Sequence, residues 1–297
     1  MTKESVSPTP LPVPGTPPDA ERIQAAFVEL VQVVARLRAP DGCPWDRAQT
    51  LATIKPYTLE ETFEVFEAID TGDDAGLTEE LGDLLLQVVL YAQIAADEGK
   101  FDLIPVVEGI TQKMLRRHPH VFGRERAETA EQVLHHWDRA KQQEKLRESV
   151  LDGVTLALPA LARTIRLSSK AARAGYDLPD AAAWREQVAQ EWRELESRLA
   201  TKVESSPNAS SAATDSGAES SGEKLESEFG ELLFAVANLA RQAGINPEDA
   251  LRKTNRRFEE RVRGLEKELS DRQGRSLRSL APEEAIALYR TRETGAD

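Results

Sequence analysis

The feature that most constrains the fold is an acidic pattern on two adjoining stretches within residues 58–94. Along the first stretch, apolar side chains recur at helical spacing and glutamates gather on another face. The second stretch, residues 81–94, is apolar around nearly its whole circumference and should be largely buried. Glu80, Asp83 and Gln87 share one face of it, at i, i+3 and i+7. The sequence therefore predicts two helices, the second of which carries carboxylates into apolar surroundings.

Carboxylates in such a place need a compensating charge, because burying an unpaired one costs on the order of several kcal/mol. Lys55 is the only Lys or Arg between Arg47 and Lys100, so the local sequence offers few cations. The gap at 71–76 is short enough to make the two helices antiparallel neighbours. Oxygen-only ligation suits Mg²⁺ or Mn²⁺ better than zinc. The carboxylates expected to meet around one cavity are those of Glu61, Glu64, Glu80 and Asp83.

A second interpretation treats the same acids as a solvated surface. An E-x-x-E pair on a helix most often faces water, and the protein would then be a structural helical scaffold. Two such pairs, one of them inside an apolar helix, favour the metal site.

Composition predicts an all-α protein. Aromatic residues make up 5% and charged residues 30% of the chain, and runs of β-forming residues are scarce. A length of 297 residues can hold two modest domains.

The net charge of −13 argues against nucleic acid or an acidic membrane surface as the main partner. A single cysteine, Cys43, excludes an intramolecular disulfide, and no apolar leader or 18-residue apolar run is present, so we expect a cytoplasmic protein.

The second half of the chain repeats the acidic pattern of the first. Residues 191–194 and 228–231 match 61–64 and 80–83 in order, spacing and setting. The separation between the two acidic pairs grows from 16 to 34 residues, and the difference of 34 − 16 = 18 is accounted for by a Ser-rich segment at about 203–222 that we expect to be flexible. The second set of carboxylates is Glu191, Glu194, Glu228 and Glu231.

These observations divide the chain into three parts. Residues 1–19 contain six prolines and are expected to form a disordered tail. Residues 20–150 form the first repeat, which opens with a helix over 20–38 capped by Asp19. Residues 151–297 form the second repeat.

Basic residues stand out in this acidic chain and are candidate phosphate ligands. Lys113, Arg116 and Arg117 close a helix predicted over 101–115, where cations are also favoured by the helix dipole alone. Trp137 and Lys141 stand at i and i+4 on the next helix, where they would contact a base and a phosphate, or would be a packed Trp and a solvated Lys. In the second repeat, Lys253 and Arg257 occupy the place of the first basic group.

With these residues assembled, the chain resembles the MazG family of nucleoside triphosphate pyrophosphohydrolases over about residues 23–269. The family signature E-E-x-x-E followed by E-x-x-D is similar to Glu60-Glu61-x-x-Glu64 and Glu80-x-x-Asp83. CPWD at 43–46, YTLEE at 57–61 and RRHPHVF at 116–122 also look like the first repeat of the family. The resemblance implies a bundle of antiparallel helices that associates as a homodimer.

The resemblance also implies an activity. It is the Mg²⁺-dependent cleavage of (deoxy)nucleoside triphosphates to the monophosphate and pyrophosphate. A metal-activated water would attack the α-phosphorus. The implied cellular role is house-cleaning, which controls the nucleotide pool. By position, the four carboxylates of each repeat would be metal ligands, with Glu60, Glu61 and Glu64 as catalytic residues. Gln190 replaces Glu60 in the second copy, so we expect the first repeat to be active. In similar two-repeat proteins the second repeat can be the catalytic one, and a catalytically weak nucleotide-binding regulatory module is the alternative function.

Overall fold

The computed structural model describes residues 14–129, 132–133, 137, 148–204 and 221–293. Within them every regular element is a helix, so the predicted all-α class is confirmed. The chain divides into two compact units, Met1–Lys145 and Leu146–Asp297, which are described separately below. Of the helices in the described part, none combines the length and apolar character needed to cross a lipid bilayer.

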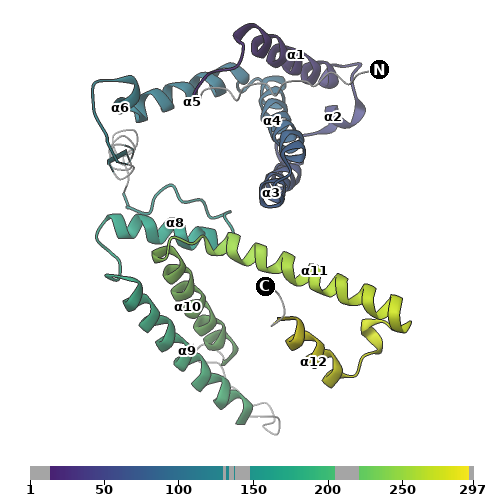
Figure 1. The fold of residues 1–297 in the computed structure, drawn as a ribbon. Coiled ribbons are helices and arrows are strands. Elements are labelled where there is room, and N and C mark those ends of the chain that lie inside the picture. The colour runs from purple at the N-terminus through teal and green to yellow at the C-terminus, as the bar shows by residue number, and fades with distance from the viewer. Residues whose placement is uncertain (1–13, 130–131, 134–136, 138–147, 205–220, 294–297) are drawn as a thin grey trace, which may run out of the picture. The chain divides into compact units, whose positions relative to one another are not determined.

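The first unit is built around the helix pair that the acidic pattern predicts. Helix α4 runs beside α3 and also contacts α1 and α5 (Figure 1). The side chain of Asp19 accepts a hydrogen bond from the backbone N–H of Arg22 at 2.8 Å, which confirms the predicted N-cap of α1. The helices of this unit are α1 (Ala20–Arg38), α2 (Pro44–Ala48), α3 (Lys55–Thr71), α4 (Asp74–Asp97), α5 (Leu103–Arg117) and α6 (Pro119–Phe122).

The turn between α3 and α4 is tighter than the predicted gap at 71–76. Gly72 ends α3 with φ of +68°, a left-handed conformation that glycine adopts without steric cost. The side chain of Asp73 then accepts a hydrogen bond from the backbone N–H of Gly76 at 3.0 Å and caps α4. This cap lets α4 begin at Asp74, so the second helix starts earlier than its apolar run indicates.

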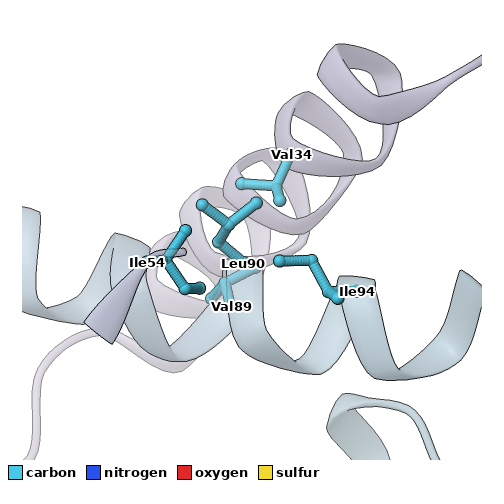
Figure 2. Packing of buried hydrophobic residues seen from close by; sticks show 5 residues of the cluster. All are labelled: Val34, Ile54, Val89, Leu90 and Ile94. Atoms are coloured by element: carbon cyan, nitrogen blue, oxygen red, sulfur yellow. The ribbon is translucent and has the colours of Figure 1, made fainter. Parts of the chain in front are cut away.

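The core of the first unit joins α1, the start of α3 and the second half of α4. Figure 2 shows Val34, Ile54, Val89, Leu90 and Ile94 packed together, each at most 5% exposed. The buried residues of α4 all lie at or after Gln87.

The first half of α4 is not covered in the same way. Leu81 and Leu85 are 49% and 40% exposed, and on α3 Phe63 and Phe66 are 40% and 41% exposed. The prediction that residues 81–94 are largely buried is therefore wrong at Leu81 and Leu85 within a single chain. The reason is that α1 and the residues before α3 cover only the second half.

The second unit repeats this arrangement of contacts. Helix α10 packs along α9 and also contacts α8 and α11, as α4 contacts α3, α1 and α5. Most of the Ser-rich segment predicted at about 203–222 lies outside the described residues. The helices are α8 (Ala160–Arg173), α9 (Ala181–Glu204), α10 (Ser221–Gln242), α11 (Pro247–Gln273), the 3-10 helix η1 (Leu277–Ser279) and α12 (Pro282–Glu293).

An ion pair ties the loop between α8 and α9 to α10. Asp177 accepts hydrogen bonds from Arg241 at 2.7 Å, from Gln242 at 3.0 Å and from the indole Nε1–H of Trp184 at 3.1 Å. The side chains of Asp177 and Arg241 are only 18% and 14% exposed. Because several donors surround one largely covered carboxylate, this contact fixes the entry into α9.

Candidate metal centre

Three carboxylates of the first unit converge between α3 and α4. Glu61 and Glu64 stand one turn apart on α3, and Glu80 lies in the first half of α4. One oxygen from each lies within 4.8 Å of the others. We call these three residues the first cluster. Their convergence agrees with the packing predicted from the acidic pattern, whereas their role as metal ligands stays a prediction.

The first cluster carries negative charge that the described protein does not neutralise. Burial, the charge of Asp83 and a hydrogen bond with Glu64 raise the pKa of Glu61 above its ordinary value. Burial, followed by the charges of Glu64 and Glu79, raises the pKa of Glu80. Among the described residues, no Lys or Arg forms an ion pair with any of the three. Carboxylates that repel one another across a few ångströms suit a hard divalent cation, so the residues present fit the metal that the sequence implies.

Two acids predicted at this site do not belong to the first cluster. Asp83 is not among the three converging residues, but its charge raises the pKa of both Glu61 and Glu80, so it lies near them. Glu60 is exposed on α3 and is also outside the set. Either carboxylate would have to act around the three converging oxygens rather than as one of them.

The basic residues of α5 differ in their surroundings. Lys113 is half-buried and Arg116 is exposed. Arg117 is 7% exposed, and its guanidinium carbon lies 5.3 Å from the ring centroid of Trp137 in a cation–π contact. The indole of Trp137 also donates to Nε2 of His118 at 3.3 Å.

This arrangement gives Arg117 and Trp137 a packing role beside any role in binding phosphate. Binding of nucleotide by these residues stays a prediction, and Lys141 lies outside the described residues.

A second cluster lies between α9 and α10 and consists of Glu191, Glu194 and Glu228. One oxygen from each again lies within 4.8 Å of the others. Glu231, the fourth carboxylate of the predicted set, is exposed and does not belong to this close group. The two repeats thus place three equivalent carboxylates together and leave the fourth outside.

The second cluster differs from the first because side chains of α9 donate hydrogen bonds to its carboxylates. The amides of Gln187 and Gln190 donate along α9, at 2.5 Å and 3.0 Å, and the guanidinium Nε of Arg198 donates across to α10. Gln187 and Arg198 were not predicted as part of this site, although aligning the two repeats position by position shows that both differ from their counterparts in the first repeat. The acceptors, in the same order, are Glu191, Glu194 and Glu228.

The basic residues predicted for the second repeat have local partners. Nζ of Lys253 lies 2.9 Å from a carboxylate oxygen of Asp249, one turn away on α11. Arg257 is exposed and donates to the hydroxyl of Thr254 at 2.8 Å. Their binding of phosphate stays a prediction.

The fold and the first cluster together define an all-α protein with a carboxylate centre suited to a divalent cation. Residues 49–122, which contain the whole first cluster, match the MazG nucleotide pyrophosphohydrolase domain. The chain is 42% identical over 244 residues to a nucleoside triphosphate pyrophosphohydrolase of Escherichia coli (strain K12), covering 80% of this chain and 86% of that protein. It is 38% identical over 273 residues to the nucleoside triphosphate pyrophosphohydrolase/pyrophosphatase MazG of Thermotoga maritima, covering 91% and 96%. The chain belongs to the MazG family of nucleotide pyrophosphohydrolases.

Proposed function

We propose that this protein hydrolyses nucleoside triphosphates to the monophosphate and pyrophosphate with Mg²⁺ held at the first cluster. The observation that carries this proposal is the convergence of Glu61, Glu64 and Glu80 within 4.8 Å, with no cation of the described protein paired to them. The cluster lies in the segment that matches the family domain. The names of the E. coli and T. maritima relatives supply the substrate class.

The residues of the first unit divide the work of this reaction. A bound Mg²⁺ would neutralise triphosphate charge and lower the pKa of a water molecule for in-line attack. Glu61, Glu64 and Glu80 would hold the ion, and Mn²⁺, which has the same preference for oxygen ligands, could replace it. Glu60, exposed on the same helix, would orient the attacking water and take its proton.

The departing pyrophosphate needs positive charge that the carboxylates do not supply. Lys113 and Arg116 carry that charge on α5, near its C-terminus. Charge-assisted hydrogen bonds from such side chains are about twice as strong as neutral ones. We propose that they hold the leaving phosphates, and that the enzyme serves to clear nucleotides from the cellular pool.

We also propose that the protein is a homodimer that covers the exposed apolar face of the first helix pair. Large exposed apolar patches on soluble proteins commonly mark interfaces. Replacing Leu85 by Glu would place a charge in that interface and should shift the protein from dimer to monomer in sedimentation velocity. An unchanged sedimentation coefficient would remove this face as the interface. The exposed side chains of the face are those of Leu59, Phe63, Phe66, Leu81 and Leu85.

Product identity tests the reaction class. Nucleoside triphosphate is incubated with the protein and Mg²⁺ or EDTA, and pyrophosphate and orthophosphate are measured separately. The expected products are the monophosphate and pyrophosphate in equal amounts, with neither formed in EDTA. Orthophosphate with the diphosphate, or turnover that persists in EDTA, would refute it. Binding of nucleotide without turnover would favour the regulatory module.

A further inference from the structure

The two carboxylate clusters differ at the positions that surround them. A shift of 130 residues overlays Glu191 on Glu61 and Glu194 on Glu64 (191 − 61 and 194 − 64). The same shift places Arg198 on Ala68 (198 − 68). Ala68 is 7% exposed on α3 and its methyl group offers no donor. The second repeat therefore has a guanidinium where the first has a methyl group.

The two amide donors of the second cluster have no equivalents in the first. Gln187 overlays Tyr57, whose ring packs edge-on against Trp45 at 5.7 Å between centroids. Gln190 overlays Glu60, which is itself a carboxylate. All three changes run in one direction, because each gives a carboxylate of the second cluster a hydrogen-bond donor from its own unit.

The guanidinium contact is the only one of these three in which both partners carry a charge. The side chain of Glu228 is 13% exposed, and its partner Arg198 is 48% exposed, so the carboxylate is largely covered while the arginine reaches in from the surface. A covered carboxylate needs a paired positive charge. Arg198 supplies a charge that cannot be lost by deprotonation, because guanidinium stays protonated in proteins.

We propose that Arg198 is the built-in cation of the second cluster and excludes a divalent metal from it. The guanidinium pairs with Glu228, and the two glutamine amides occupy lone pairs on Glu191 and Glu194. A metal ion would have to displace Arg198 and would then lie beside its positive charge. The second cluster is therefore an ion-pair joint between α9 and α10, and not a metal centre.

This inference rests on the proposed function, in which the first cluster holds the metal. It departs from the sequence-based expectation that both sets of carboxylates are ligands. It assigns the two repeats different tasks, so the first unit carries the metal-dependent site and the second retains the helix pair as a scaffold. Arg198 is the residue that makes the difference, by its charge and position rather than by contact with substrate.

Counting bound Mn²⁺ tests this inference without measuring activity. Mn²⁺ is titrated into the full-length metal-free protein, and the electron paramagnetic resonance signal of the free ion gives the number bound per chain. The wild type should bind about one tightly held Mn²⁺. Arg198→Ala, which recreates the Ala68 environment, should bind about two, with Mn²⁺ affinity at the second cluster raised by at least about tenfold.

Matched variants separate the role of Arg198 from a general change in charge. Arg193→Ala removes one positive charge from the same helix, at a pair with Glu186 whose side chains are 65% and 77% exposed, and should bind as the wild type does. Arg198→Met keeps the aliphatic part of the side chain and removes its charge. It replaces Arg198→Ala in the titration if the circular dichroism of Arg198→Ala shows a loss of helix. Adding Glu64→Gln to Arg198→Ala should leave one ion, which assigns the gained ion to the second cluster.

Each outcome decides between the two claims. Two ions bound by the wild type, or no additional ion in Arg198→Ala and Arg198→Met, would overturn the role of Arg198. No ion bound by the wild type would instead refute the proposed metal centre of the first unit. In that case the gain or absence of one ion in Arg198→Ala would still decide whether Arg198 excludes metal.

Discussion

Replacing Glu61 by Gln should stabilise the metal-free protein and destabilise it relative to the wild type when Mg²⁺ is present. The oxygens of Glu61, Glu64 and Glu80 lie within 4.8 Å of one another. Two unit charges at that separation repel by about 1 kcal/mol in water. Glu61 faces two such neighbours, but the site is open enough for salt to screen part of the repulsion. We therefore expect the free energy of unfolding to rise by about 1 kcal/mol, or the melting temperature by about 2–4 °C.

Magnesium should reverse which of the two proteins, wild type or Glu61→Gln, has the higher free energy of unfolding. A ligand present at 100 times its Kd, and bound only by the folded state, adds about 2.7 kcal/mol to the free energy of unfolding. The wild type should gain this amount, and Glu61→Gln should lose most of it because one charged ligand is missing. Differential scanning calorimetry in EDTA and in Mg²⁺ measures both effects. Glu67→Gln, on the exposed side of the same helix, is the control for net charge.

Acid should remove the advantage of the variant in EDTA. Burial and the charge of Asp83 raise the pKa of Glu61 in the folded protein above its ordinary value. A raised carboxylate pKa penalises the folded state above that pKa, and the penalty is lost as the pH falls through it. The two proteins should therefore differ at pH 7 and converge on acidification. A wild type that is more stable than Glu61→Gln in EDTA, or an equal gain from Mg²⁺ in both, would refute the reasoning.

Two further predictions concern stability. Asp177→Asn should lower the free energy of unfolding of the second unit by about 2 kcal/mol, measured by urea denaturation, because a largely buried carboxylate loses its charged hydrogen bonds. An unchanged free energy of unfolding at neutral pH would contradict the stabilising role of this ion pair. Burial opposes the charge of Asp177, but hydrogen bonds from Arg241 and Trp184 lower its pKa overall, so the stabilisation should be present at neutral pH and be lost as the pH falls through that lowered pKa. Ile54→Ala should lower the free energy of unfolding of the first unit by about 2–5 kcal/mol, since Ile54 is fully buried in the core. If the exposed control Ile23→Ala lowered the free energy of unfolding by more than Ile54→Ala does, the assignment of the core would be refuted.

The helices and the convergence of the carboxylates could be predicted from sequence because both depend on local periodicity. The acids at 61 and 64 share a face at any helical register, and a short turn brings 80 beside them. The wider set could not be fixed in this way. Whether Asp83 or Glu231 joins the close group depends on the rotation and separation of two packed helices, which the spacing of acids along one helix does not determine.

The solvent exposure of individual side chains was harder to predict than the positions of the helices. An apolar circumference predicted burial over residues 81–94, but Leu81 and Leu85 remain exposed because α1 and Ile54 pack only against the second half of α4. Lys113 and Arg117 read alike in the sequence, yet Arg117 is buried against Trp137. Such differences arise from contacts between distant segments, which periodicity alone does not encode.

The donors of the second cluster were missed for another reason. Gln187 and Arg198 lie outside the family signature and are ordinary polar residues of a helix when read alone. Their meaning emerges when each is compared with its counterpart in the first repeat. A charged residue that replaces a buried alanine beside carboxylates is a signal that an internal duplication makes visible in a single sequence.

Pyrophosphate release by matched variants of the two clusters tests which cluster catalyses the reaction. Wild type, Glu64→Gln and Glu194→Gln are assayed with Mg²⁺ and a panel of nucleoside triphosphates, with Glu67→Gln as the charge control. If the first cluster holds the catalytic metal, Glu64→Gln abolishes pyrophosphate release, while Glu194→Gln and Glu67→Gln keep most of it. Loss in Glu194→Gln with activity retained in Glu64→Gln would refute the catalytic role of the first cluster and place the reaction in the second repeat.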